Sequence, residues 1–217
     1  MYRRLFTGLV ERGKTSEFLA AMREASAHQS DRGIRARTTV WGCVTGQTNG
    51  VAISSDFNTL DDLERFTDLA TEDARFAVVR RAVRQAMVFE ASEVNIERLS
   101  YHSQGLISSE EATAPRRYMR TLSGEVLPGH HRDFVMSISQ ALAYQDERGI
   151  NAVTSVWSAV TGGTSRVSIV AEFDSLAELE RFDEIAAQDQ EFARLRRKTR
   201  ESMVFLTSRV ELFRNLL

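Results

Sequence analysis

The sequence has little cysteine, proline or lysine, and each scarcity narrows what the protein can be. A single cysteine, Cys43, rules out an internal disulfide and a metal site built from several cysteines. Two prolines among 217 residues leave no room for a low-complexity or linker-dominated chain. Lys14 and Lys198 are the only lysines, so arginine carries nearly all of the positive charge. A lone thiol suits a reducing compartment, and we expect a cytoplasmic protein.

Long apolar runs and a surplus of charge of one sign are absent too. No run approaches the roughly 18 apolar residues of a membrane-spanning helix, and the N-terminal segment lacks the apolar core of a signal peptide. The formal net charge is −2, so nothing indicates the basic surface that nucleic-acid binding requires. With 42% hydrophobic and 27% charged residues the composition is that of a globular protein. We expect neither a membrane nor a nucleic-acid partner.

What the sequence does contain is an internal repeat. A constant shift of 116 residues aligns its halves without a gap, as in RTTVWGCVTGQT at 37–48 and VTSVWSAVTGGT at 153–164. Roughly 40 of about 100 aligned pairs are identical, far above chance. We therefore predict two copies of one ferredoxin-like domain, at 1–101 and 118–217, with a polar connector at 102–117.

Each copy predicts the element order β-α-β-β-α-β. The first helix is expected from about Lys14 to Asp31, with an equivalent helix in the second copy. Gly33 and Gly149 follow these helices, at the place where a helix C-terminus favours a left-handed residue. Thr59 and Ser175 begin capping boxes for the second helix. The stripes expected to be buried are Phe18, Ala21, Met22 and Ala25 on the first helix, and Leu60, Leu63 and Phe66 on the second.

The element order, the stretch F-x-[ST]-L-x-x-L-E-R-F at 57–66 and 173–182, and the late MVF strand resemble the dimeric α/β-barrel superfamily. That superfamily includes antibiotic-biosynthesis monooxygenase-like and NIPSNAP-like proteins. The resemblance covers nearly the whole chain. It implies an α+β fold in which two tandem ferredoxin-like βαββαβ repeats form an α/β barrel within one chain. A further homo-oligomer, using other surfaces, is left open.

The function implied by the resemblance is a small-molecule enzyme. Like the cofactor-free monooxygenases, it would act on an aromatic or polyketide-like substrate in a barrel pocket, with no cofactor. Two alternatives remain: a non-catalytic small-ligand-binding or structural NIPSNAP-like protein, and a haem-binding barrel. The haem-degrading branch uses a histidine on the second helix, and neither copy has one, so haem is disfavoured. Whether the chain is an enzyme at all stays open.

Candidate site residues come from strand alternation and from the pairs of the repeat. Alternation places Arg37, Thr39 and Trp41 on the sheet face away from the helices. Trp41 and its mate Trp157 would wall a planar ligand, or simply pack in the core. His28, whose mate is Tyr144, would serve as a general base, or be an ordinary helical histidine. The candidates are therefore His28 and Arg37 as catalytic residues, and Thr39, Trp41, Tyr144 and Trp157 as substrate-binding residues.

Two further expectations concern charge and symmetry. The arginines at 80, 81 and 84, repeated at 196, 197 and 200, would bind an anion, or form a solvated face at a helix C-terminus. A fused pair also frees one copy to change its pocket. Because the first copy keeps both His28 and Arg37, we expect the pocket there, walled by Trp41.

Overall fold

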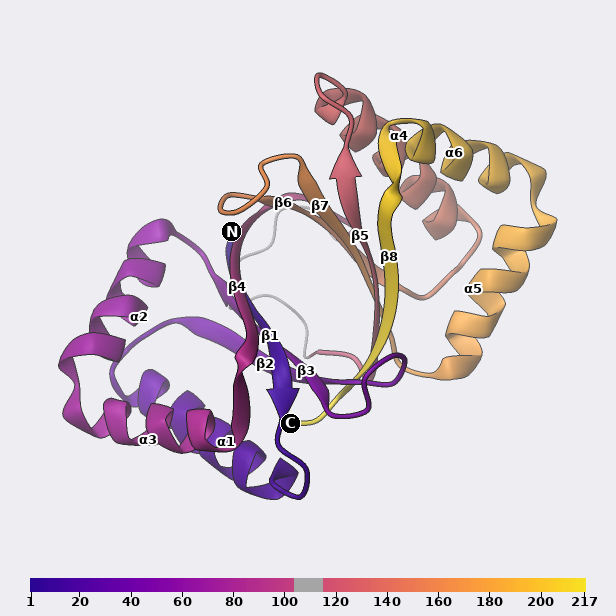
Figure 1. Cartoon of the computed structure of the whole chain (residues 1–217). Helices are drawn as coiled ribbons and strands as arrows, with labels where there is room; N and C mark the ends of the chain where they lie inside the picture. Colours follow the sequence, from indigo (N-terminus) through magenta and orange to yellow (C-terminus); the bar gives the residue numbers. More distant parts are fainter. Residues whose placement is uncertain (104–114) are drawn as a thin grey trace. The chain divides into compact units, whose positions relative to one another are not determined.

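The computed structural model describes residues 1–103 and 115–217, apart from the side chains of residues 89, 90, 205 and 206. These residues form eight strands and six helices (Figure 1). Hydrogen bonding joins the strands in the closed order β1-β3-β2-β8-β5-β7-β6-β4, which is the strand order of a barrel. The predicted α+β class and barrel order are thus confirmed. Most of the predicted connector, 102–117, lies outside the described residues.

The chain divides into two compact units, of which the first comprises residues 1–97 and 213–217. Its helices cover one face of its sheet (Figure 1). The start of β4 and the end of β8 complete that sheet beside β1 and β2. Its elements are β1 (Tyr2–Val10), α1 (Thr15–Asp31), β2 (Ala36–Cys43), β3 (Gly50–Phe57), α2 (Leu60–Glu72), α3 (Ala74–Gln85) and β4 (Met87–His102).

The second unit, which comprises residues 98–103 and 115–212, repeats this order. The bounds of five element pairs differ by 116 at both ends, for example 15–31 of α1 and 131–147 of α4. In this unit β7 pairs antiparallel with both β5 and β6. Its elements are β5 (Tyr118–Val126), α4 (His131–Glu147), β6 (Val153–Ala159), β7 (Arg166–Phe173), α5 (Leu176–Gln188), α6 (Gln190–Glu201) and β8 (Met203–Asn215).

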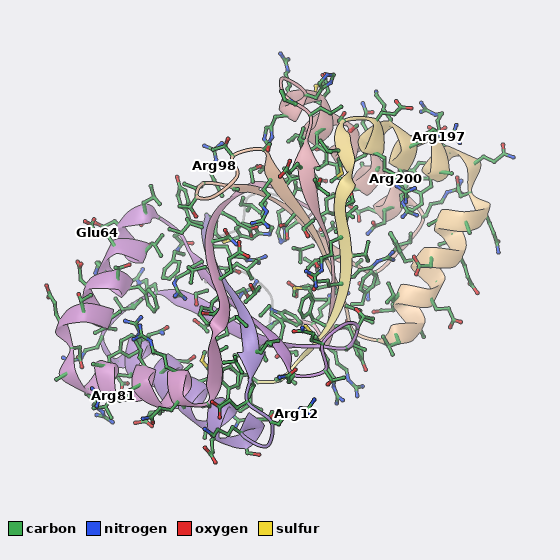
Figure 2. All side chains as sticks on the ribbon, viewed as in Figure 1. Arg12, Glu64, Arg81, Arg98, Arg197 and Arg200 are labelled. Atoms are coloured by element: carbon green, nitrogen blue, oxygen red, sulfur yellow. The ribbon has the colours of Figure 1, made fainter. Side chains whose placement is uncertain are left out.

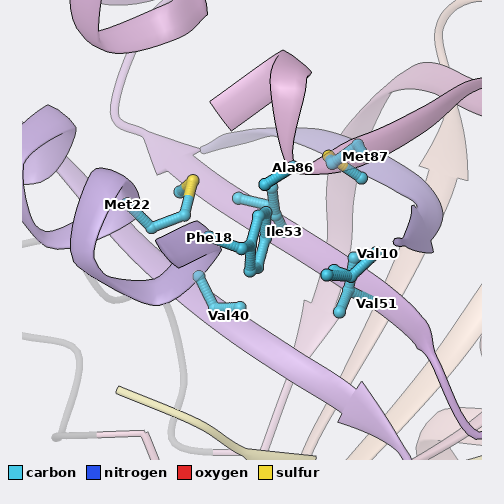
Figure 3. Close-up of a cluster of buried hydrophobic side chains, with 8 residues drawn as sticks. All are labelled: Val10, Phe18, Met22, Val40, Val51, Ile53, Ala86 and Met87. Atoms are coloured by element: carbon cyan, nitrogen blue, oxygen red, sulfur yellow. The ribbon is translucent and has the colours of Figure 1, made fainter. Parts of the chain in front are cut away.

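Apolar side chains between sheet and helices hold the first unit together. Phe18 and Met22 of α1 lie against Val40 and Ile53 of the strands (Figure 3). Phe18 and Val40 are fully buried, which confirms the predicted stripe on α1. Burial of each such side chain contributes about 1.5–3 kcal/mol before the entropy of ordering is subtracted.

One expectation from the sequence is confirmed here and one is wrong. The sequence predicts that Asp73 caps a further helical segment that carries Phe76 and Val79. This segment is α3: Asp73 adopts an extended backbone at φ −86 and ψ 109, and its side chain accepts a hydrogen bond from the amide of Phe76. Leu60 was expected to be buried, but it is 50% exposed. It is the first residue of α2, where the helix has only begun to pack; Leu63 and Phe66, one turn later, are buried.

The capping box of α2 is present as predicted. The Thr59 hydroxyl accepts the amide of Asp62, and the Asp62 carboxylate accepts the amide of Thr59. We expect Thr59→Ala to lower the free energy of unfolding by about 1 kcal/mol, because the amide of Asp62 loses its acceptor at the helix end. Urea denaturation measures this loss, and Thr59→Ser should restore it. An unchanged midpoint in Thr59→Ala would contradict the assignment.

Candidate functional site

The second unit contains a pocket of about 480 Å³ between its sheet and its helices. Alternate residues of β5 and β7 reach it from the sheet, and residues one turn apart reach it from α4 and α6. This volume is in the range of small-molecule sites. Its apolar wall includes Leu122, Ile138, Leu142, Ile169, Phe182 and Phe192.

A few polar groups interrupt that apolar wall. Gln145 is only 2% exposed, and its amide lies 3.5 Å from the hydroxyl of Thr154. Thr199 also lines the pocket, and its hydroxyl donates a hydrogen bond to the carbonyl of Leu195 on the same helix. The pocket thus combines an apolar body with a small number of hydrogen-bonding groups, as binding sites for organic molecules do.

Arginines form one side of the pocket. Arg120 of β5 and Arg196 and Arg200 of α6 line it together. Figure 2 shows Arg200 and its neighbour Arg197 on α6. Burial, and after it the charges of Arg200 and Arg120, lower the pKa of Arg196 below its ordinary value. The cations are therefore crowded against an apolar surface.

The equivalent space in the first unit has different side chains. Phe6 stands at the position of Leu122, and Val83 at that of Thr199. Both pack against the buried cluster around Phe18 (residues Val10, Phe18, Met22, Val40, Val51, Ile53, Ala86 and Met87). Residues at equivalent positions of the repeat therefore fill the core in the first unit and line a pocket in the second.

Arg37, Thr39 and Trp41 lie on the sheet face predicted from strand alternation. Their neighbours across β3 show this, since Arg37 bonds to Asp56 at 3.0 Å and the Trp41 indole donates to Ser54 at 3.3 Å. Thr39 and Trp41 are buried, at 3% and 2% exposure. Arg37 also lines a second pocket, of about 400 Å³, at the end of α1.

The cation of Arg37 belongs to a buried ion cluster. Asp56 is 1% exposed and accepts hydrogen bonds from Arg3 at 2.7 Å and from Arg37 at 3.0 Å. Burial by itself would raise the pKa of Asp56, but the charges and hydrogen bonds of the two arginines outweigh it and lower the pKa below 3.8. Much of the positive charge of Arg37 is thereby balanced within the first unit.

His28 of α1 packs against Phe76 of α3. It is 5% exposed, stacks on Phe76 at 5.7 Å, and its Nε2 lies 3.2 Å from the carboxylate of Asp73. Arg32 binds the same carboxylate at 2.6 Å. The structure therefore places His28 in a buried contact between two helices.

Tyr144 and Trp157, the candidates of the second unit, are held in a similar way. The Tyr144 hydroxyl donates to Asp189 at 2.9 Å, and its ring stacks on Phe192 at 6.2 Å. Trp157 is 1% exposed and donates to Ser155 at 2.8 Å. None of the six candidates lines the pocket of about 480 Å³ in the second unit, which is called the large pocket below. Their roles in function stay predictions.

Comparison with known proteins identifies the fold. No family model matches the chain, and no curated protein matches its sequence. An anthrone oxidase-like protein matches with a TM-score of 0.66 at 13% identity, over 100% of this chain and 91% of its own. A Lactobacillus acidophilus protein named as a candidate monooxygenase gives 0.67 at 10% identity, over 99% and 93%. The haem-degrading enzyme of Listeria monocytogenes gives 0.53 at 8% identity, over 99% of each chain. At these identities the likeness shows the fold alone.

The residues of the large pocket do not fit haem. Haem iron is usually held by histidine, cysteine, tyrosine or methionine. Of these residue types, only Met203 lines the pocket in the part of the chain that the structure describes, and it is packed in the core of the second unit at 6% exposure. In the described parts of the chain, no group of three His, Cys, Asp or Glu side chains could hold a metal ion.

The pocket was missed from the sequence because its signal lies in side-chain size. Leu122 is smaller than its mate Phe6, and Ala171 is smaller than its mate Ser55, but Leu142 is larger than its mate Ser26. The net effect of such size changes on the pocket volume depends on how the side chains pack.

Among the described residues, no helix has the length and apolar character needed to cross a membrane.

Proposed function

We propose that this chain is a cofactor-independent oxygenase whose substrate is a flat, apolar, aromatic or polyketide-like molecule bound in the pocket of the second unit. The pocket of about 480 Å³ carries this proposal, since its apolar wall and few polar groups match such a molecule. The anthrone oxidase-like and monooxygenase-like neighbours share the fold and support the reaction class. The site thereby moves from the first copy, where the sequence suggested it, to the second.

The chemistry needs an acidic substrate. Among the described residues, those that line the pocket include no carboxylate and no imidazole, and so no obvious general base. Arg196 and its neighbours favour the deprotonated form of an enol or phenol, because nearby positive charge stabilises an oxyanion. The resulting anion reacts with O₂. Overall, a methylene carbon loses two hydrogens and gains one oxygen atom from O₂, while the other oxygen atom leaves as water.

The test uses anthrone, which has such a methylene group, and Ala171, which lines the pocket on β7. Purified protein should consume O₂ in the presence of anthrone and form anthraquinone. Ala171→Leu, which narrows the pocket, should lower this rate by about tenfold or more, because misplacement of the substrate is costly. Ala171→Ser is the matched control, since serine is the residue at the same place in the first copy, and it should keep most of the rate.

Equal rates in both variants would contradict a reaction in this pocket. The missing base favours a second candidate, a non-catalytic binding protein for the same kind of molecule. That candidate predicts no O₂ consumption above the buffer rate, but binding of an aromatic probe that Ala171→Leu weakens and Ala171→Ser does not.

A further inference from the structure

Positive charge is in excess on the wall of the pocket in the second unit. Arg120 donates to the carboxylate of Asp183 at 2.7 Å, and Asp183 is 53% exposed. Arg196 and Arg200 form no ion pair with a carboxylate among the residues that the structure describes. Asp183 is thus the one carboxylate in that part of the chain whose charge acts on Arg196, and it is already paired with Arg120, so the three guanidinium groups of this wall outnumber their counter-charge.

These cations are held close together by the aromatic ring of Phe182. The guanidinium of Arg120 lies 5.7 Å from the centre of that ring, and that of Arg196 lies 5.6 Å from it. Arg196 also lies 5.7 Å from the ring centre of Phe192. The ring faces offset part of the repulsion between the cations. An anion placed beside them would offset far more of it.

We propose that the ligand carries an ionised acid group on its flat apolar body, and that Arg196, with Arg120 and Arg200, binds this group. The inference rests on the proposed function and names the substrate class of the same pocket. Guanidinium groups suit this task, because their planar donors match the two oxygens of an acid group. The apolar wall takes the ring system, and the arginines fix which edge of it faces them.

The first unit has the same three arginines in a different setting. Arg4 lies over Phe6 and Phe66, at 5.9 and 5.6 Å, and Arg80 donates to the carbonyl of Ala70 at 2.8 Å. Phe6 stands where the second unit has Leu122, so the equivalent space holds a larger ring. Arg80 is therefore the matched control for Arg196.

The test compares two fluorescent probes with one ring system. Anilinonaphthalene sulfonate carries an ionised acid group, and phenylnaphthylamine is the same molecule without it. The full chain should bind the sulfonate about tenfold more tightly than the neutral probe, as a charge-assisted hydrogen bond provides. Arg196→Gln should remove most of that preference and leave the neutral probe within about twofold. Arg80→Gln should leave both affinities unchanged.

Competition with naphthoate and with naphthol then shows whether a carboxylate or a phenol-type oxygen is preferred. Three results would overturn the inference. The probes could bind equally well, Arg196→Gln could weaken both alike, or Arg80→Gln could act as strongly as Arg196→Gln. In each of these cases the proposed pocket would still be supported if Ala171→Leu weakened the binding of the neutral probe phenylnaphthylamine. If neither probe bound, the proposed function and this inference would fail together.

Discussion

Replacement of Asp56 by asparagine will lower the free energy of unfolding by about 3–5 kcal/mol, because it leaves buried cations without their counter-charge. Asp56 is 1% exposed and lies between Arg3 at 2.7 Å and Arg37 at 3.0 Å. Arg3 is itself 4% exposed, so water cannot replace the lost carboxylate. Urea denaturation of the purified variant measures the effect.

The same carboxylate makes stability depend on pH at the acidic end. Burial raises the pKa of Asp56, but Arg3 and Arg37 lower it further, so that in the folded state it lies below the ordinary 3.8. A depressed folded pKa gives stability that is present above the unfolded pKa and is lost as the pH falls through the folded one. Below pH 3.8, therefore, the natural protein should lose stability more steeply than Asp56→Asn.

The control for Asp56 is a more exposed ion pair. Asp183 binds Arg120 at the same distance of 2.7 Å, but it is 53% exposed. Asp183→Asn should cost less than about 1 kcal/mol, because water screens such a pair. Losses of similar size in the two variants would contradict the buried cluster, and so would a parallel pH profile for Asp56→Asn and the natural protein.

Local patterns were enough to predict the helices and the faces of the strands. Alternation along one strand set Arg37 and Trp41 on one face, and their bonds to Asp56 and Ser54 bear this out. The left-handed backbone at Gly33, with φ 70, could be predicted because few residues other than glycine adopt that conformation. These features depend on a few neighbouring residues, and the repeat showed each of them twice.

The ion cluster and the pocket could not be predicted, because both depend on strand register and side-chain packing. Arg3 meets Asp56 only because β1 pairs with β3 in one particular register. The candidate base His28 looked functional because the sequence predicts it to be the only histidine inside a helix or strand, whereas in the structure His102 ends β4 and His131 begins α4. In the structure it is a buried neighbour of Asp73 and Phe76, a packing environment that composition does not reveal. The sequence left two interpretations of the arginines at 196, 197 and 200, an anion site or a solvated face. The position of Arg196 over Phe182 and Phe192 supports the anion site and could not be predicted, because it depends on packing.

Phe66 and Phe182 are equivalent positions at which the same substitution should have unequal effects. Each ring contacts two aromatic rings of its own unit: Phe57 at 5.6 Å and Phe76 at 6.1 Å for Phe66, and Phe173 at 6.0 Å and Phe192 at 5.8 Å for Phe182. Phe66 is buried at 9% exposure, whereas Phe182 is partly exposed and lines the pocket. The aromatic partners match, so the pocket is the main difference between the two sites.

We expect Phe66→Ala to lower the free energy of unfolding by about 3–5 kcal/mol, since it opens a cavity in a filled core. Phe182→Ala should cost less, about 2 kcal/mol, because one side of its ring already faces the pocket and fewer contacts are lost. Chemical denaturation of the two variants measures the difference. Equal losses would mean that the core of the second unit is as filled as that of the first.

Ligand binding should change in the opposite order. Phe182→Ala removes both the apolar wall and the ring over which Arg120 and Arg196 lie, so the affinity for anilinonaphthalene sulfonate should fall by about tenfold. Phe66→Ala should leave that affinity unchanged in protein that remains folded, because Phe66 belongs to the other unit. If Phe182→Ala is more stable than Phe66→Ala but binds the sulfonate less tightly, the two variants distinguish the role of the pocket in binding from the role of the core in stability. If Phe66→Ala weakened the binding of the sulfonate as much as Phe182→Ala does, the two copies would differ in packing but not in ligand binding.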